Sequence, residues 1–399
     1  MEENKKNKIP NVPNLRFFEF TGDYHCANIK TVSIFVKDGT HGTHQNVENG
    51  VPLLSAKDIA NGIINIDVDS RRISFKDYKK IFKRITPTKN DVLITIVGTV
   101  GRTAIIPDNF PIFAFQRSVG WIRPTNAIHP EYFDFVLQSK SVQQRIQKEV
   151  NASAQGGIYL EKLSSIKIDV PSLEEQIKVS CFLKLINERI NTQNKIIEEY
   201  EALRKSILDL LICNSLEQGK SKIGKIIKEY NVKTIADNEY PVLSSTASGI
   251  YYQSDYFNKE AASEDTTGYK CVPKGYCTYR SMSDTGRFYF NIQTITDVGI
   301  VSPAYPVFQV IEDSSLFFIS VINNDKNMLN QILKLKAGGT RFSLPFKKLI
   351  QLDIPWPDYQ TRHYFQKIIR AFDKRIDLEK SLLAKYLKQK NYLLDNLFI

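Results

Sequence analysis

The sequence lacks the features that mark disulfide-stabilised, secreted and membrane-spanning proteins. Its 399 residues contain five cysteines, whose odd number and irregular spacing give no disulfide framework and fit a reducing compartment. It has no uninterrupted apolar run of about eighteen residues, so no transmembrane helix is predicted. The polar residues 1–8 have no apolar core behind them and do not form a signal peptide. We therefore expect a cytoplasmic protein with no membrane partner.

Enzyme signatures are also missing. The sequence has no Asn-Pro-Pro-aromatic motif for amino methylation, no G-x-G-x-x-G after a strand and no Walker loop. His41 and His44 form an H-x-x-H that could bind a metal, but no nearby cysteine or carboxylate completes a ligand set, and loop histidines near phosphate or base are favoured. We expect no catalytic residue, no metal site and no cofactor in this chain. A nuclease or other independent enzyme is the least favoured interpretation.

The composition is that of a folded protein with an excess of positive charge. Hydrophobic residues make up 42% and charged residues 24% of the chain, as is usual for globular proteins, and the formal net charge is +11. Such a charge favours an anionic partner, which is nucleic acid or, less often, a membrane face. Because many soluble proteins are basic without a special function, the charge needs support from sequence patterns.

The clearest pattern is a heptad seam that occurs twice, the second copy 186 residues after the first. The predicted packing residues are Leu183, Ile186, Ile190, Ile197, Tyr200, Ile207 and Leu211, and then Ile369, Phe372, Ile376, Leu383, Tyr386, Leu393 and Leu397. Polar residues interrupt both seams at matched positions, Gln193 and Arg204 in the first and Glu379 and Lys390 in the second. These residues either fix the register of two antiparallel helices or lie on an exposed part of the seam.

The approach to each helix is repeated as well. A strand-like segment ends at Pro171 and is followed by Gln176, and a second ends at Pro355 and is followed by Gln360. The chain is therefore predicted to repeat a globular segment, a short strand and a long helix. The predicted boundaries are 1–157 and 214–339 for the globular segments, and 158–213 and 340–399 for the helical regions.

Each globular segment has the pattern of a mixed α/β domain. In the first, 91–97 and 102–107 are predicted as strands around a tight turn at 98–101, and 130–150 as one helix. In the second, 275–280 and 286–289 repeat the strand pair, 307–310 is a strand and 315–335 is helical. The fold class is α+β, with two mixed α/β domains separated by two long antiparallel coiled-coil helices in a pseudo-two-fold internal repeat.

Residues able to contact DNA lie in the loops of both globular segments. Arginine pairs with guanine and glutamine with adenine, and hydroxyl groups reach phosphates or bases. The candidates are Thr40, His41, Thr43, His44, Arg71, Arg72, Arg102, Gln116 and Arg117 in the first segment, and Ser244, Ser245, Thr246, Arg280, Ser281, Arg287 and Arg341 in the second. The alternatives are a structural turn at 40–44 and plain surface charge at Arg71, Arg72 and Lys76.

Four segments contain motifs that occur in a fixed order along the chain: the opening at 13–22, the D-G-T-H loop at 37–43, the G-T-x-G-R turn at 98–102 and the entry to a long helix at 168–176. In this order they resemble the N-terminal opening, the two loop motifs and the helical spacer of the specificity (S) subunit of type I restriction-modification systems. The second half departs from the pattern, because it has no D-G-T-H loop and has Trp-Pro-Asp-Tyr at 356–359 in place of an acidic pair.

This resemblance implies that each globular segment is a target-recognition domain for one half of a split site in double-stranded DNA. The helices would be the spacer, and the chain would be non-catalytic. It would bind two methyltransferase subunits, and two restriction subunits would complete the complex. S-adenosylmethionine, ATP and magnesium would be bound by those partners.

The helix length agrees with a spacer. A helix of about forty residues extends about 60 Å, or about 18 base pairs of duplex. The alternative is a coiled-coil scaffold that joins two protein-binding domains and never contacts DNA. It predicts little salt dependence of binding to duplex, whereas DNA-reading domains lose affinity steeply as salt rises.

Overall fold

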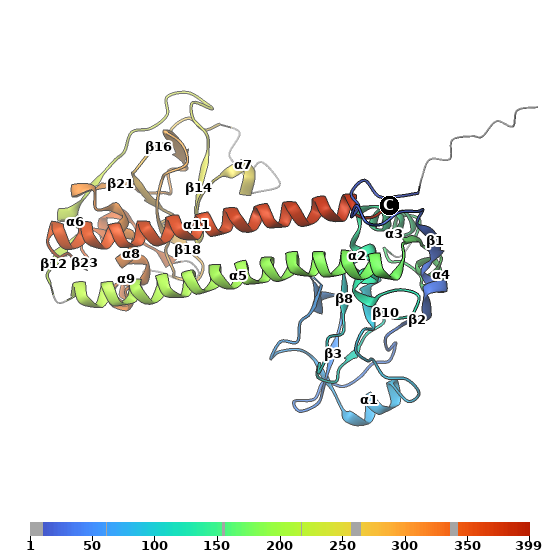
Figure 1. The fold of residues 1–399 in the computed structure, drawn as a ribbon. Helices are drawn as coiled ribbons and strands as arrows, with labels where there is room; N and C mark the ends of the chain where they lie inside the picture. Colours follow the sequence, from blue (N-terminus) through green and yellow to red (C-terminus); the bar gives the residue numbers. More distant parts are fainter. Residues whose placement is uncertain (1–10, 61, 154–155, 217, 257–264, 336–341) are drawn as a thin grey trace, which may run out of the picture. The chain divides into compact units, whose positions relative to one another are not determined.

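The computed structural model describes residues 11–60, 62–153, 156–216, 218–256, 265–335 and 342–399. The chain forms two compact units, unit 1 with residues 1–194 and 381–399 and unit 2 with residues 195–380. Each unit contains one globular segment and a part of both long helices, α5 (Leu173–Leu216) and α11 (Tyr359–Asn396) (Figure 1). The division thus falls inside the helices, whereas the predicted boundaries at 157 and 213 follow the order of segments along the chain. The boundary at 339 lies outside the described residues.

Unit 1 is built on a four-stranded antiparallel sheet of order β2-β10-β7-β8 and a smaller sheet of order β6-β3-β9. Its elements before α5 are β1 (His25–Asn28), η1 (Ile29–Val32), β2 (Ser33–Asp38), β3 (Val51–Leu54), η2 (Ala56–Asp58), β4 (Ile59–Ala60), β5 (Ile63–Ile64), β6 (Arg72–Ile73), α1 (Phe75–Ile81), β7 (Val92–Thr95), β8 (Thr103–Ile105), β9 (Ala114–Phe115), β10 (Val119–Pro124), α2 (Pro130–Gln138), α3 (Lys140–Asn151), α4 (Leu160–Ser165) and β11 (Lys167–Val170).

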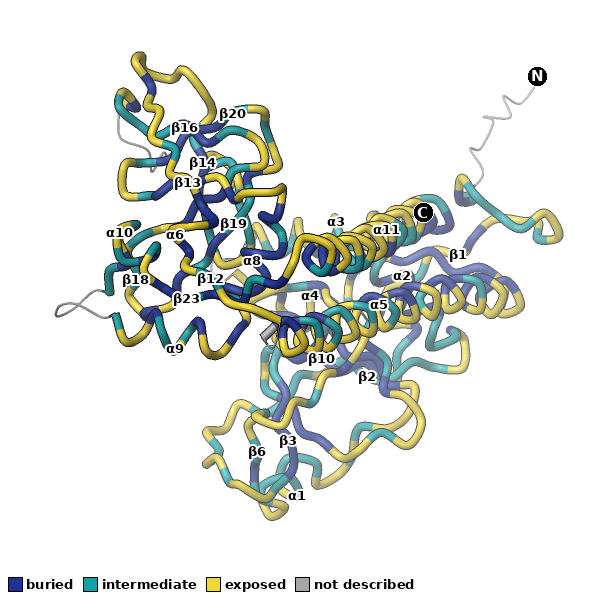
Figure 2. Tube along the Cα trace, turned by 90° about the vertical axis from the view of Figure 1, so that its left-hand side faces the viewer, coloured by how far each residue is buried: buried dark blue, intermediate teal, exposed yellow. Residues whose placement is uncertain are grey.

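The core of unit 1 lies on both faces of this sheet. Val92 and Ile94 of β7 pack with Tyr132 and Phe133 of α2, while Leu93 between them belongs to a second cluster with Trp121. Successive side chains of a strand point to opposite faces, so a continuous apolar strand is stable only when both faces are covered. Figure 2 shows this buried centre in dark blue.

The single helix predicted over 130–150 is wrong, because the chain forms α2 and α3. They are separated by Ser139, which has an extended backbone (φ −61, ψ 149) and whose hydroxyl accepts the amide hydrogen of Val142 at 3.4 Å. An N-cap serine competes with the continuing helix. The helical stretch of unit 2 is interrupted in the same way at Asp325, between α8 (Ser315–Asn324) and α9 (Lys326–Lys334).

Unit 2 repeats this topology with the sheet order β13-β21-β17-β19. In both sheets the first strand along the chain pairs with the last, and two intervening antiparallel strands complete the sheet, so the predicted internal repeat is confirmed. Besides α8 and α9, the elements are β12 (Lys220–Lys222), α6 (Ile223–Ile226), β13 (Ile227–Glu229), β14 (Leu243–Thr246), β15 (Gly249–Tyr252), α7 (Gln253–Tyr256), β16 (Lys270–Pro273), β17 (Cys277–Tyr279), β18 (Met282–Ser283), β19 (Phe290–Ile292), β20 (Val298–Val301), β21 (Val307–Val310), η3 (Ile311–Asp313), β22 (Phe342–Ser343), α10 (Phe346–Leu349) and β23 (Asp353–Pro355).

The long helices pack antiparallel within each unit. In unit 1 the core joins Leu183 and Ile186, near the start of α5, to Leu394, near the end of α11. In unit 2 it joins Ile212, near the end of α5, to Ile369, near the start of α11. The packing residues predicted from the heptads are all buried or half-buried. Within the described ranges, no helix combines the length and the apolar character that a membrane span needs.

The polar seam residues are covered as well. Gln193 and Glu379 are each 5% exposed. Arg204 Nε donates to Asp373 Oδ1 at 2.6 Å, and Arg375 Nη2 lies 2.6 Å from Glu379 Oε1. The burial of Gln193 and Glu379 and the bond from Arg204 on α5 to Asp373 on α11 show that the seam is closed at these three polar positions.

The two helix entries are not equivalent as the proline spacing predicted. Gln176 is buried, and its Oε1 accepts the amide hydrogen of His129 at 2.7 Å at the start of α2. Gln360 is exposed, and the buried position 186 residues after Gln176 is Arg362. The guanidinium of Arg362 donates to Ser314 Oγ at 3.1 Å and to the Glu312 carboxylate. The segment between Pro355 and α11 is two residues longer, which shifts the helix register.

Candidate nucleic-acid interface

Three loops of unit 1 leave the same end of its main sheet. The register pairs Asp38 of β2 with Gly120 of β10, Val119 with Thr95 of β7, and Ile94 with Thr103 of β8. The loops that follow β2, precede β10 and connect β7 to β8 are therefore neighbours at one sheet edge. They contain the candidates Thr40, His41, Thr43, His44, Arg102, Gln116 and Arg117.

The loop at 40–44 is fastened to the loop before β10. The Thr40 amide donates to Phe115 O at 2.9 Å, and the Arg117 amide donates to Thr40 O at 3.1 Å. Gly39 permits this approach, because a Cβ there would lie 2.0 Å from Phe115 O. Inside the loop, Thr40 Oγ1 lies 2.9 Å from His44 Nε2. The structure thus brings Thr40 and His44 together with Gln116 and Arg117.

The arginines of this region fall into two groups. Arg71 donates to His44 O, and Arg72 Nη1 donates to Gly50 O at 3.2 Å, so both support loop backbone. Arg102 and Arg117 are exposed. Arg102 lies at the same sheet edge as Thr40 but three strand spacings away, which is about 14 Å.

A basic pocket beside Thr40 contains residues that the sequence analysis missed. This pocket, of about 370 Å³, is lined by the cations Lys37, Lys83 and Arg84, by one acid, Asp38, and by Thr40 and the aromatic side chains of Phe82 and Trp121. The available sequence signal was the density of lysine and arginine between residues 76 and 84. Its significance depends on the fold, which places residues 83–84 next to the loop at 40–44.

In unit 2 four of the predicted residues line one pocket. Ser245, Thr246, Arg280 and Arg287 surround a volume of about 250 Å³. Asn291 holds one wall, since its Nδ2 donates to Ser245 Oγ at 2.8 Å and to Thr246 O at 2.9 Å.

The remaining candidates of unit 2 lie apart from this pocket lining. Ser244 is buried and alternates to the other side of β14, and Ser281 Oγ donates to Ala304 O at 2.6 Å. Arg341 lies outside the described residues.

The arrangement of the histidines and cysteines gives no support for a metal site or a reactive thiol within the described residues. His41 Nε2 lies 2.7 Å from Asp38 Oδ2, a carboxylate that the sequence analysis overlooked. Even with it, the described residues contain no group of three or more histidine, cysteine or carboxylate side chains placed to hold a metal. All five cysteines are free thiols. Burial raises the pKa of Cys277 to about 12, which keeps this thiol protonated and unreactive.

Known proteins resemble this chain in sequence. A family model described as the type I restriction modification DNA specificity domain matches residues 27–202. The type I restriction enzyme MjaVIII specificity subunit of Methanocaldococcus jannaschii is 24% identical over 220 residues, 53% of this chain and 49% of that protein, so the match spans about half of the relative. The putative MjaX specificity subunit of the same organism is 22% identical over 433 residues, 99% of this chain and 95% of that protein.

The fold agrees with these sequence matches. The crystal structure of a type I restriction-modification system S subunit from M. genitalium covers 97% of this chain with 99% of its own length, at a TM-score of 0.58 and 17% identity. Residues 27–202 therefore belong to the DNA specificity domain family of type I restriction-modification systems, and the chain as a whole is similar in sequence to a putative specificity subunit of such a system and has the fold of a solved S subunit.

Proposed function

We propose that this chain is the DNA-recognition subunit of a type I restriction-modification complex and that each unit reads one half of a bipartite, asymmetric duplex site. The observation that carries the proposal is that one topology occurs twice with different polar side chains at the same sheet edge. Unit 1 offers Thr40, Gln116 and Arg117 there, and unit 2 offers Arg280 and Arg287 in the loop between β17 and β19. Repeated scaffolds with unlike contact residues suit two unlike half-sites.

The helices support a spacer role. With 44 residues, α5 has a length of about 66 Å, or about 19 base pairs of duplex. A continuous helix of this length is sufficient to separate two half-sites by more than one duplex turn.

The chain itself is proposed to be non-catalytic. Two methyltransferase subunits and two restriction subunits would supply S-adenosylmethionine, ATP and magnesium chemistry. The helices α5 and α11 expose Leu185, Leu210 and Leu378 at 62%, 60% and 59%, respectively, and these apolar side chains could contact helices of the methyltransferase subunits.

The test is to sequence the methylated sites in a host that carries the complete system. The expected result is one bipartite motif in the parent, a relaxed first half-site in Q116A/R117A and a relaxed second half-site in R280A/R287A. Lys205→Gln, an exposed change on α5, is the control and should leave the motif unchanged. If the two double variants change the same half-site, or if neither changes the motif, the assignment of one half-site to each unit is wrong.

A further inference from the structure

A helix of unit 1 carries a set of cations that the reading loops do not include. Lys76, Lys79, Lys80 and Lys83 follow one another at intervals of three, one and three residues, and Arg84 comes next. All five are exposed. The helix repeat puts Lys76, Lys79 and Lys80 on one side of α1, and Lys83 and Arg84 follow directly after the helix ends. We refer to these five residues as the basic face.

The opposite side of α1 is anchored, which fixes the direction of the basic face. Tyr78, Ile81 and Phe82 pack against the cluster that contains Val51 and Leu53 of β3. The Phe82 ring lies 5.7 Å from the Phe115 ring and 6.0 Å from the Trp121 ring. Such aromatic packing holds the helix firmly on the unit.

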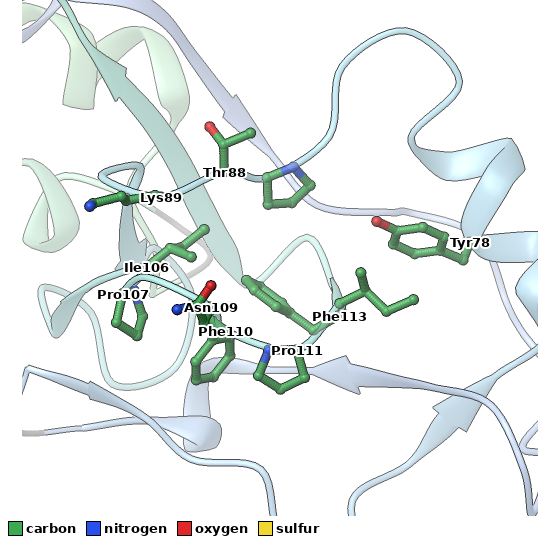
Figure 3. A pocket seen from close by; sticks show the side chains of 11 residues that line it. Tyr78, Thr88, Lys89, Ile106, Pro107, Asn109, Phe110, Pro111 and Phe113 are labelled. Carbon is green, nitrogen blue, oxygen red and sulfur yellow. The ribbon is translucent and has the colours of Figure 1, made fainter.

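Tyr78 also lies close to a second group of aromatic residues. It projects toward Phe110 and Phe113 across a small pocket of about 130 Å³ (Figure 3), and burial raises its pKa. The helix start is fixed by Ser74, whose Oγ accepts the amide hydrogen of Asp77 at 3.1 Å. Figures 1 and 2 both show α1 beyond β3, on the side of unit 1 away from α2.

The basic face has a large excess of positive charge. Asp77 is the one acidic residue between Phe75 and Ile85, and it lies 3.6 Å from Lys80. Among the ion pairs of the described residues, no other carboxylate pairs with the basic face. The face therefore suits a ligand with several regularly spaced negative charges.

The basic face adjoins the reading loop. Lys83 and Arg84 share a pocket with Lys37 and Thr40. A duplex contacted by that loop would therefore meet these cations with its phosphates. In unit 2, the short helix α7 has the sequence Gln-Ser-Asp-Tyr, with one acidic residue and no cation.

We propose that the basic face of α1 binds the phosphate backbone of the duplex without regard to sequence, and that unit 1 therefore contributes more of the salt-dependent binding than unit 2. The inference rests on the proposed function, since it assumes that the loop at 40–44 approaches DNA. It adds that the loops select the bases, whereas α1 supplies affinity for the DNA backbone.

The test uses the chain assembled with its methyltransferase subunit and two duplexes, one with the methylated motif and one scrambled. Dissociation constants are measured between about 50 and 200 mM salt. The slope of log affinity against log salt is negative, and in K76Q/K79Q/K80Q/K83Q its magnitude should decrease by about 0.9 for each phosphate that a lysine no longer neutralises, hence by up to about 3.6. Affinity for both duplexes should fall by the same factor, so their ratio is unchanged.

Two matched variants complete the experiment. K76R/K79R/K80R/K83R keeps the charges and should keep the parental slope. K225Q/K326Q/K334Q/K347Q removes four exposed lysines of unit 2 and should reduce the magnitude of the slope less. A parental slope in the α1 glutamine variant, or a loss confined to the motif duplex, overturns the inference while leaving the proposed function intact. A parent that binds both duplexes equally contradicts the proposed function itself.

Discussion

Arg16 binds the carboxylate of Glu175 through two hydrogen bonds, from Nε to Oε1 and from Nη2 to Oε2, each 2.8 Å long. Glu175 is 1% exposed and also accepts the hydroxyl hydrogen of Tyr24 at 2.9 Å. The guanidinium donates in addition to Gly22 O at 2.7 Å. These bonds fasten the segment before β1 to the first turn of α5, across 159 residues of sequence.

Arg16→Ala should destabilise unit 1 by about 3–5 kcal/mol, because it leaves a buried carboxylate without its cation. The chain has two tryptophans, Trp121 in unit 1 and Trp356 in unit 2. Urea unfolding followed by Trp121 fluorescence in a W356F background measures the effect. Arg16→Lys keeps the charge but loses the two-pronged geometry, so its loss should be smaller. A loss below about 1 kcal/mol for Arg16→Ala would mean that the pair is dispensable.

Substitutions at the same position of the two heptad seams should destabilise different units. Leu183 and Ile369 occupy the same position of the repeat, are 1% and 0% exposed, and belong to the cores of unit 1 and unit 2, respectively. Replacing either by alanine should destabilise its own unit by about 2–5 kcal/mol. Trp121 reports on Leu183→Ala in the W356F background, and Trp356 reports on Ile369→Ala in a W121F background. Equal effects of both variants on both probes would show that the chain unfolds as one unit.

The parts of the fold that depend on local periodicity could be predicted from the sequence. The spacing of Leu183, Ile186 and Ile190 is determined by the helix repeat itself, so the long helices, their antiparallel packing and the duplication follow from it. The central strands were equally evident, because 91–97 and 307–310 are short apolar runs between turn residues.

The parts of the fold that depend on contacts between distant segments could not be predicted from the sequence. Gln176 and Gln360 are not equivalent, because two extra residues precede α11. Only the burial of Arg362 shows that this arginine, and not Gln360, occupies the position in α11 that Gln176 occupies in α5. A serine such as Ser139 can lie inside a helix or cap the start of one, and tertiary packing decides which of the two occurs. The basic pocket next to Thr40 needs residues 37 and 83–84 to meet, which no local pattern encodes.

The stability of unit 1 should decrease as pH rises through the titration of Asp134. This carboxyl of α2 is buried, and burial raises its pKa to about 6, from 3.8 for an ordinary aspartate, against the opposing effects of Thr103, Lys390 and Gln138. Between about pH 4 and 6, the Asp134 carboxyl therefore keeps its proton in the folded chain and has lost it in the unfolded chain. Its contribution is complete below about pH 4 and is lost as pH rises through about 6, a difference of about 3 kcal/mol.

Asp134→Asn tests this dependence. The stability of the variant relative to the parent should increase by about 3 kcal/mol between pH 4 and 7, as measured by urea unfolding with Trp121 fluorescence. Asp395→Asn, at an exposed position of α11 in unit 1, should show no such change. A difference between parent and Asp134→Asn that is constant over this pH range would mean that Asp134 titrates normally.

Gly39→Ala should displace the reading loop of unit 1. A Cβ at Gly39 would lie 2.0 Å from Phe115 O and 2.5 Å from Gln116 O, and both are backbone atoms that cannot move aside without disturbing the strand. The hydrogen bond from the Thr40 amide to Phe115 O would break, and Thr40 would separate from Arg117. We expect a loss of about 1–3 kcal/mol and a relaxed first half-site in the methylated motif, with the second unchanged. Gly42→Ala is the matched control for stability, since the nearest atoms to a Cβ there belong to side chains, the His44 ring at 3.1 Å and Thr40 Oγ1 at 3.5 Å, and not to the backbone of a strand. If Gly39→Ala retains the parental motif, the position of this loop does not determine the first half-site, and base selection by unit 1 must come from Arg102 or another part of the sheet edge.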